Sequence, residues 1–209
     1  MAFTYGQVEA ALARMFNADP EVQRTTFRAR IVHLRRVGIP LGLNPGRGKR
    51  IAYEMEQVYQ LGLCLELEEM GLDPALISRI METFWANMFY PHLIEEEQKL
   101  GFSLGPEHIP DDLFFAIYPK FMSGQWDRQP YSVENFPEFV EFLPFRIKEA
   151  AAALSNRRMC TLNLSAFIRA IRQSFMDVGA AEALPEHLRP GVAEARAFAR
   201  ATPPRGVRA

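Results

Sequence analysis

The chain has 209 residues, 48% of them hydrophobic and 23% charged, and a formal net charge of −1. This is the composition of an ordinary globular protein with one large or two small domains, and no stretch approaches the ~20 apolar residues of a membrane-spanning helix. The N-terminus lacks the pattern of a secretory signal, and Cys64 and Cys160 lie far apart without metal-ligand spacing. We therefore expect a cytoplasmic protein whose two cysteines are buried thiols rather than a disulfide or a metal site.

The first predicted helix spans Tyr5 to Phe16. Thr4 is a suitable N-cap because its hydroxyl can accept a hydrogen bond from a first-turn amide. The Asp19-Pro20 pair should break the helix. One buried face is predicted from the spacing of Val8, Leu12 and Met15.

The second predicted helix spans Thr25 to Arg36, with Thr25 as its N-cap and Gly38 as its C-cap. Its apolar residues recur at helical spacing and form one face: Phe27, Ile31 and Leu34. The opposite face carries small and hydrogen-bonding residues, namely Thr25, Thr26, Ala29, His33 and Arg36, with Arg28 and Arg30 on its flanks. Such a surface lets a helix approach base edges while arginines reach phosphates or guanine.

The chain from Arg24 to Arg50 contains eight Lys or Arg residues and no acid, an asymmetry that the whole-chain charge hides. Its last part, Leu43 to Arg50, is a predicted turn with basic residues at the tip. A strand from Arg50 to Tyr53 should follow. A phosphate backbone is the commonest partner of such a block, although a solvated basic face is the simpler alternative.

At this point the sequence resembles the DNA-binding domain of MerR-type transcription regulators. The resemblance rests on short segments in the family's order, Arg36-Val37-Gly38-Ile39, Gly48 to Tyr53, Gln57 to Leu61, and Gly71 to Ile77, and covers about residues 3 to 81. It implies a winged helix-turn-helix in which Thr25 to Arg36 enters the major groove. It also implies that the basic wing, Arg47 to Arg50, contacts the neighbouring backbone or minor groove.

This sequence departs from the family in several places. The family's Arg-Tyr-Tyr is replaced by Val32-His33-Leu34, so its base contacts are not carried over to these positions. The wing has an extra residue before Tyr53, the first two helices are joined by a long linker, and no heptad run for a dimerising coiled coil follows. The cysteines of the metal-responsive branch are absent.

A third helix should run from Tyr53 or Glu54 to Met70, end at Gly71, and be apolar on two sides, which is typical of a helix sandwiched between others. Asp73-Pro74 should start a fourth helix that continues to about Tyr90, where Pro91 disturbs it. Residues 51 to 98 hold ten acids and one base. We expect this segment to face away from DNA.

The second half of the chain is rich in aromatic residues, and 15 of the 24 aromatics lie between residues 84 and 145. We predict strands at 113–118, 138–143 and 158–162, a helix at 146–156, and a last helix capped by Ser165 and closed by Gly179. An ordinary core is the simplest interpretation, and a ligand pocket or dimer interface is the alternative. The chain from Ala180 should be mobile.

The remaining polar residues give no sign of chemistry. His92 and His108 lie near Glu95, Glu96 and Glu97 but lack a metal-ligand spacing, and this acidic run is most simply a solvated helix end. We find no nucleophile elbow, phosphate-binding loop or placeable acid-base pair. We therefore predict no enzymatic activity, no cofactor and no metal.

The predicted fold is mainly α with a small sheet: a winged helix-turn-helix at residues 1–81, an α+β dimerisation or effector domain at 82–179, and a tail at 180–209. The predicted function is a homodimeric, sequence-specific regulator of transcription that binds double-stranded DNA. An adaptor or ligand-binding module that uses the aromatic half is the alternative, and a non-specific nucleoid protein is the third. The predicted DNA-binding residues are Thr25, Thr26, Arg28, Arg30, His33, Arg36, Arg47, Lys49 and Arg50.

Overall fold

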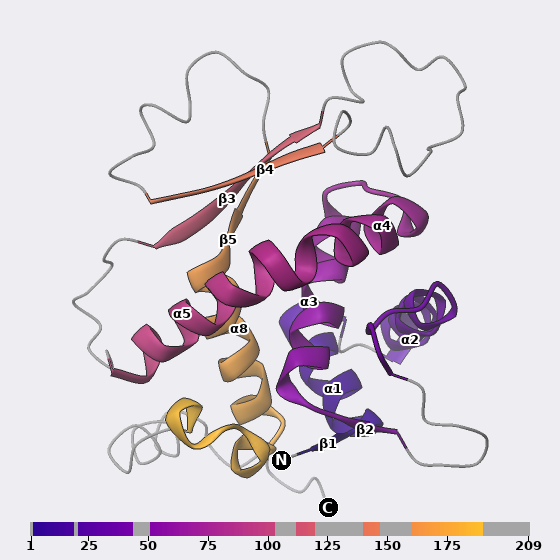
Figure 1. The fold of residues 1–209 in the computed structure, drawn as a ribbon. Coiled ribbons are helices and arrows are strands. Elements are labelled where there is room, and N and C mark those ends of the chain that lie inside the picture. Colours follow the sequence, from indigo (N-terminus) through magenta and orange to yellow (C-terminus); the bar gives the residue numbers. More distant parts are fainter. Residues whose placement is uncertain are drawn as a thin grey trace, which may run out of the picture.

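The protein is mainly helical, with two small antiparallel sheets that lie at different ends of the helical body (Figure 1). This agrees with the predicted mixture of many helices and little sheet. The computed structural model describes residues 2–18, 21–43, 51–102, 112–119, 140–146 and 160–189.

The chain begins with strand β1 (Phe3–Thr4) and helix α1 (Tyr5–Met15). Thr4 caps α1 as predicted, and Gln7 completes a capping box by accepting a hydrogen bond from the Thr4 backbone N–H. The sequence did not predict β1. It pairs antiparallel with β2 (Ala52–Tyr53), so that Phe3 lies opposite Tyr53.

Helix α2 (Glu21–Arg36) has the predicted end but not the predicted start. Thr25 is not its N-cap, because no residue from Glu21 to Arg24 breaks a helix and α2 therefore extends back to the Asp19-Pro20 pair. At the other end Gly38 has φ +90°, and the N–H of Ile39 donates to the carbonyl of Leu34 at 3.0 Å. This Schellman-type closure confirms the predicted C-cap.

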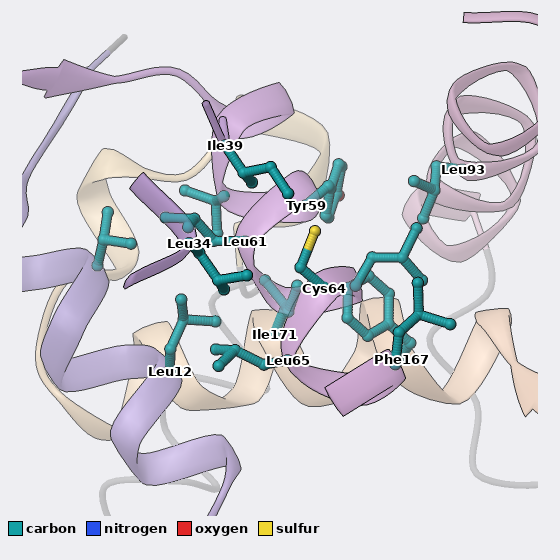
Figure 2. Packing of buried hydrophobic residues seen from close by; sticks show 14 of the residues in the cluster. Leu12, Leu34, Ile39, Tyr59, Leu61, Cys64, Leu65, Leu93, Phe167 and Ile171 are labelled. Carbon is teal, nitrogen blue, oxygen red and sulfur yellow. The ribbon is translucent and has the colours of Figure 1, made fainter. Parts of the chain in front are cut away.

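Helix α3 (Met55–Glu69) lies at the centre of the molecule, with side chains of α1, α2, α5 and α8 around it (Figure 2). Every residue from Val58 to Leu65 is buried, which confirms that the helix is sandwiched. Gln60 on α3 accepts a hydrogen bond from the Leu41 N–H at 2.6 Å and thereby fixes the turn that follows α2. Gly71 ends the helix with φ +88°.

Helix α4 (Pro74–Phe84) starts as predicted, with Asp73 accepting hydrogen bonds from two first-turn amides. The helical structure that begins with α4 does not end near Tyr90 as predicted. A π-helical turn (Trp85–Phe89) joins it to α5 (Tyr90–Phe102), so helical structure continues past Pro91. The Tyr90 N–H donates to the Trp85 carbonyl, five residues back. This wider turn accommodates a proline, which lacks the N–H and crowds the carbonyl four residues before it.

The second sheet has β3 (Leu113–Pro119) at its centre, flanked by β4 (Val140–Arg146) and β5 (Cys160–Asn163), both antiparallel to it. All three predicted strands exist, but the second reaches Arg146 and the third reaches Asn163. Residues 138–139 and 158–159 of these predictions lie outside the described residues. Pro144 lies on a flanking strand, where its missing N–H is tolerated. Arg146 therefore belongs to β4 rather than to a helix, and the rest of the predicted helix at 146–156 lies outside the described residues.

Helix α8 (Leu164–Asp177) follows β5 directly. Its N-cap is Asn163, whose side chain accepts a hydrogen bond from the Ala166 N–H at 2.8 Å, and not Ser165 as predicted. Ser165 is the second residue of the helix and is buried, because α8 begins at Leu164, earlier than predicted and directly after the strand. Gly179 closes α8 with φ +72°, as predicted.

The chain after α8 differs from the expected mobile tail over its first ten residues. It forms two short 3₁₀ turns, Ala181–Ala183 and Glu186–Leu188. Leu184 and Leu188 are buried in the core, and this apolar burial holds the segment in place. The remainder, 190–209, lies outside the described residues.

The buried residues form one hydrophobic core that includes both halves of the chain. The Phe3 and Phe175 rings, from β1 and α8, lie 4.6 Å apart between centroids. Gly62 on α3 faces the Phe167 ring and Ile171 of α8. The predicted division at 81/82 falls within α4, and that division stays a prediction.

Candidate nucleic-acid interface

The polar face of α2 is exposed, as the helical spacing predicts. Its buried side consists of Phe27, Ile31 and Leu34, which pack on the core. The opposite side exposes Thr25, Thr26, Ala29, His33 and Arg36. Within the described ranges, neither His33 nor Arg36 takes part in an ion pair, so both remain available to an external anion.

One flank of α2 faces α1 and carries two arginines that share one acid. Glu9 of α1 is only 2% exposed. Arg28 donates to it with two nitrogens, Nε to Oε2 at 3.0 Å and Nη2 to Oε1 at 2.7 Å, while Arg24 Nε lies 3.4 Å from Oε1. The side chain of Arg28 is nevertheless 57% exposed. Two positive charges and one negative charge give this cluster of Glu9, Arg24 and Arg28 a net charge of +1.

The other flank of α2 faces α3 and has the opposite balance. Arg30 Nε donates to Glu68 at 2.8 Å, and its Nη1 donates to Glu69 at 2.6 Å. One positive and two negative charges leave this flank with a net charge of −1. Arg30 therefore ties α2 to α3, and its assignment as a flanking DNA contact stays a prediction. Two acids of the segment expected to face away from DNA, Glu68 and Glu69, thus lie beside α2, and that expectation stays a prediction.

Contacts within the two clusters shift the pKa values of Glu9, Arg28 and Arg30. Burial alone would raise the pKa of Glu9, but the hydrogen bonds and charges of Arg28 and Arg24 outweigh it and lower that pKa. The same hydrogen bond to Glu9 raises the pKa of Arg28. Burial alone would lower the pKa of Arg30, but hydrogen bonds to Glu68 and Glu69 outweigh it and raise that pKa.

The flank that faces α1 also borders the ribbon formed by β1 and β2. Arg35 is exposed, and its guanidinium carbon lies 6.0 Å from the centre of the Tyr5 ring, a cation–π distance. The Tyr5 ring in turn lies 6.4 Å from that of Tyr53 on β2. The predicted wing residues Arg47, Lys49 and Arg50 precede β2 in the sequence and lie outside the described residues.

Sequence reasoning missed Glu9, the acid that organises the α1 flank. It is the only acid in α1, and it lies beside the apolar residues Val8 and Leu12 in the sequence. The sequence offered one indication of its role, namely that a single acid lies near the apolar face of a short helix that must pack against other helices. Its partners could not be named because they depend on how α1 and α2 cross.

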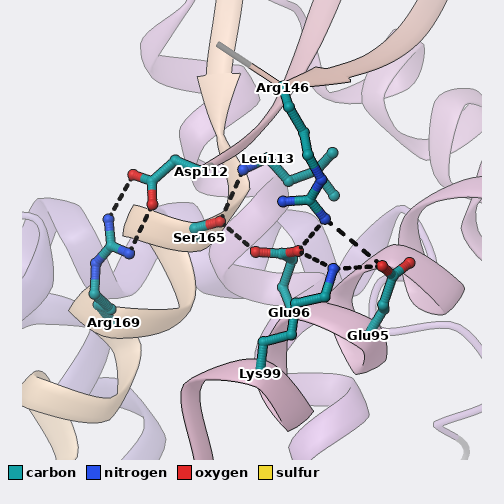
Figure 3. A network of polar contacts seen from close by, with 8 residues as sticks. All are labelled: Glu95, Glu96, Lys99, Asp112, Leu113, Arg146, Ser165 and Arg169. Atoms are coloured by element: carbon teal, nitrogen blue, oxygen red, sulfur yellow. Dashed lines mark hydrogen bonds and ion pairs between the residues drawn. The ribbon is translucent and has the colours of Figure 1, made fainter. Parts of the chain in front are cut away.

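A second polar cluster lies inside the molecule, between α5, β4 and α8 (Figure 3). Glu96 is 4% exposed and accepts hydrogen bonds from Ser165 at 2.5 Å, Arg146 at 2.7 Å and Lys99 at 3.1 Å. Burial would raise the pKa of Glu96, but these donors together lower it. Only Glu95 of the Glu95–Glu97 run is exposed, so the interpretation as a solvated helix end is wrong for the other two.

Glu97 joins the central helix to the end of the described chain. It accepts a hydrogen bond from the buried Tyr59 hydroxyl of α3 at 2.7 Å, and it pairs with His187. Desolvation and the neighbouring Glu97 raise the pKa of Tyr59 well above its ordinary value. The two carboxylates thus connect helices, strand and C-terminal turns, which is a structural role.

The described residues contain no group of three or more His, Cys, Asp or Glu side chains arranged to hold a metal ion. Cys64 is a buried free thiol and Cys160 is a half-buried one. No helix in the described ranges has both the length and the apolar character needed to cross a membrane.

Comparison with protein-family models finds no match to this chain. Comparison with curated proteins finds no match either. The chemistry of the α2 surface therefore carries the functional argument.

Proposed function

We propose that this protein is a sequence-specific DNA-binding regulator of transcription that works as a homodimer. The observation that carries the proposal is the exposed face of α2. It combines small side chains at Thr25, Thr26 and Ala29 with His33 and Arg36, and this combination suits a helix that lies against base edges.

Several features support this surface as a DNA contact. The buried side of α2 is held by the core, so the exposed side is presented on a rigid element. The α1 flank adds net positive charge beside it, as phosphate contacts require. The basic residues Arg47, Lys49 and Arg50 precede β2 in the sequence, and Tyr53 of β2 lies beside Tyr5, which Arg35 contacts.

Dimerisation is proposed because one such module reads only a few base pairs. Two copies related by a two-fold axis double the length of the site and give a palindrome whose half-site spacing mirrors the protein. The C-terminal half, from α5 to α8, is the proposed dimerisation or effector region.

Selection from random duplex DNA at about 150 mM salt tests this function, because weak attraction to phosphates alone is largely suppressed there. We expect an enriched, roughly palindromic motif. Binding without enrichment would instead indicate a nucleoid protein. Absence of binding by the full chain would reject the proposal and favour an adaptor.

One observation favours the adaptor as a second candidate function, namely that Arg24, Arg28 and Arg30 already pair with acids of the same chain.

Two variants separate base reading from phosphate attraction. Thr26→Ala should change the preferred motif while leaving non-specific affinity within about twofold, because Thr26 is exposed on the face that would read bases. R47A/K49A should weaken binding to all DNA and lower the salt slope by about two, at roughly 0.9 per lost phosphate contact. Equal loss of specific and non-specific binding in Thr26→Ala would contradict the assignment of the reading face.

A further inference from the structure

The two flanks of α2 hold arginines in different ways. On the α1 side the single acid, Glu9, is buried, while the arginines that it binds reach into solvent. On the α3 side Arg30 is only 28% exposed, and one of its two acids, Glu69, is 55% exposed. An approaching phosphate therefore meets cations first on the α1 side and a carboxylate on the α3 side.

The geometry of Arg28 leaves it able to bind a second oxyanion. A guanidinium has five N–H donors, and Glu9 takes one from Nε and one from Nη2. Three donors are therefore not used by Glu9, and the side chain is 57% exposed. A carboxylate behind an arginine and a phosphate in front of it can be bound at the same time, since each uses a different edge of the planar fork.

Glu9 also reduces the entropic cost of such a contact. A solvated arginine samples many rotamers and loses this freedom when it binds, at a cost of about 0.5–1.5 kcal/mol per side chain. The bidentate pair holds Arg28 in one pose before DNA arrives. Because two arginines share the one carboxylate, the cluster keeps its net positive charge while being ordered.

We propose that Glu9 is a positioning residue of the DNA interface, which fixes Arg28 and Arg24 along the α1 side of α2 so that they meet the phosphate backbone there. This inference rests on the proposed function. It also assigns an orientation, because the backbone then runs along the α1 flank and not along the acidic α3 flank.

The decisive variant is Glu9→Gln. The two possible roles of Glu9, neutralising the arginines or positioning them, predict opposite changes in DNA affinity. Removing a negative charge from a basic surface would strengthen binding if Glu9 only neutralised the arginines. If Glu9 positions them, E9Q should bind the selected sequence about tenfold more weakly, as expected for losing one charge-assisted hydrogen bond. Its salt slope should fall by about 0.9, although the net charge has become more positive.

Two further variants serve as controls. Arg28→Lys keeps the charge but loses the bidentate fork, so its affinity should fall by a similar factor; this exposed substitution also decides the question if E9Q does not fold. Glu69→Gln makes the same charge change on the other flank, where Arg30 keeps Glu68. Its affinity should stay within about twofold of wild type.

The possible failures can be told apart. If the wild-type chain binds no duplex at all, the proposed function falls and the positioning role falls with it. If wild type binds a selected sequence while E9Q and R28K bind it equally well or better, only the positioning role is overturned. If E69Q weakens binding as much as E9Q does, the assignment of the backbone to the α1 flank is wrong.

Discussion

Glu96 shows how a single charged residue can be stable inside this protein. It lies in a run of three glutamates, yet its carboxylate is 4% exposed and receives hydrogen bonds from Ser165, Arg146 and Lys99. A buried carboxylate with this many donors remains ionised, and its removal takes away the 2.7 Å ion pair of Arg146, which then keeps the longer one to Glu95 at 3.6 Å. The three donors come from α8, β4 and α5, so the residue holds the C-terminal half together.

Glu96→Gln should therefore destabilise the protein at neutral pH by about 3 kcal/mol, because Arg146 is left as a largely buried charge without its closest acid. The folded-state pKa of Glu96 lies below its ordinary value of 4.5. The stabilisation is therefore complete above pH 4.5 and is lost as pH falls through the folded-state pKa. Urea unfolding of both proteins between pH 3 and 7 measures the difference.

The matched control is Glu95→Gln, which removes a neighbouring but exposed carboxylate that pairs with Lys99 and, at 3.6 Å, with Arg146. Exposed pairs contribute little, so this change should have an effect of less than about 1 kcal/mol at any pH. If the E96Q difference did not shrink in acid, or if E95Q cost as much, the buried network would not be the source of the stabilisation.

At the scale of elements, three helices end in the same way. Gly38, Gly71 and Gly179 follow α2, α3 and α8, and each has a positive φ that other residues rarely adopt. After α2 this closure matters for the candidate interface. The Ile39 and Gly38 amides bond back to the last turn, and the Leu41 N–H that follows donates to Gln60.

Gly38→Ala should lower the free energy of unfolding by about 1 kcal/mol, since alanine is strained at φ +90°. A Cβ at this position would meet no atom within 4 Å, so the cost comes from the backbone alone. Gly6→Ala, in the first turn of α1 with equally open surroundings, is the control and should be neutral or stabilising. Thermal unfolding compares the two, and equal effects would exclude backbone strain as the cause.

These helix ends were predictable because they depend on neighbours in the sequence. Thr4, Asp73 and the three glycines were assigned correctly from the residues beside them. The wrong predictions concern residues whose role depends on a partner far away in the sequence. Ser165 and Glu96 look like a cap and a solvated acid until α5 and α8 meet, and Arg30 looks free until α3 packs on α2. The exposed face of α2 was predicted, but the acids that hold its flanks were not.

At the scale of the molecule, the candidate interface depends on residues far from it in the sequence. α2 is positioned by α1 and α3, and both of these pack against α8. Helices α3 and α8 come close together at Gly62 of α3, where a Cβ would lie 3.0 Å from the Phe167 ring and 3.2 Å from Ile171. Glycine is needed here to let the two helices touch, so the N-terminal and C-terminal halves should unfold together.

A double-mutant cycle on this contact measures the coupling of the two halves. Gly62→Ala alone should destabilise the protein by about 1–2 kcal/mol, because the added methyl group overpacks the contact with Phe167. In a Phe167→Leu background the crowded ring is gone, and the same change should be neutral or stabilising through alanine's higher helix propensity. The coupling energy should therefore reach about 1 kcal/mol or more.

A single transition seen by both fluorescence and circular dichroism would show that the halves unfold together. The same destabilisation in both backgrounds would mean that α3 and α8 do not meet at Gly62 in solution, and the support of α2 by the C-terminal half would then be disproved.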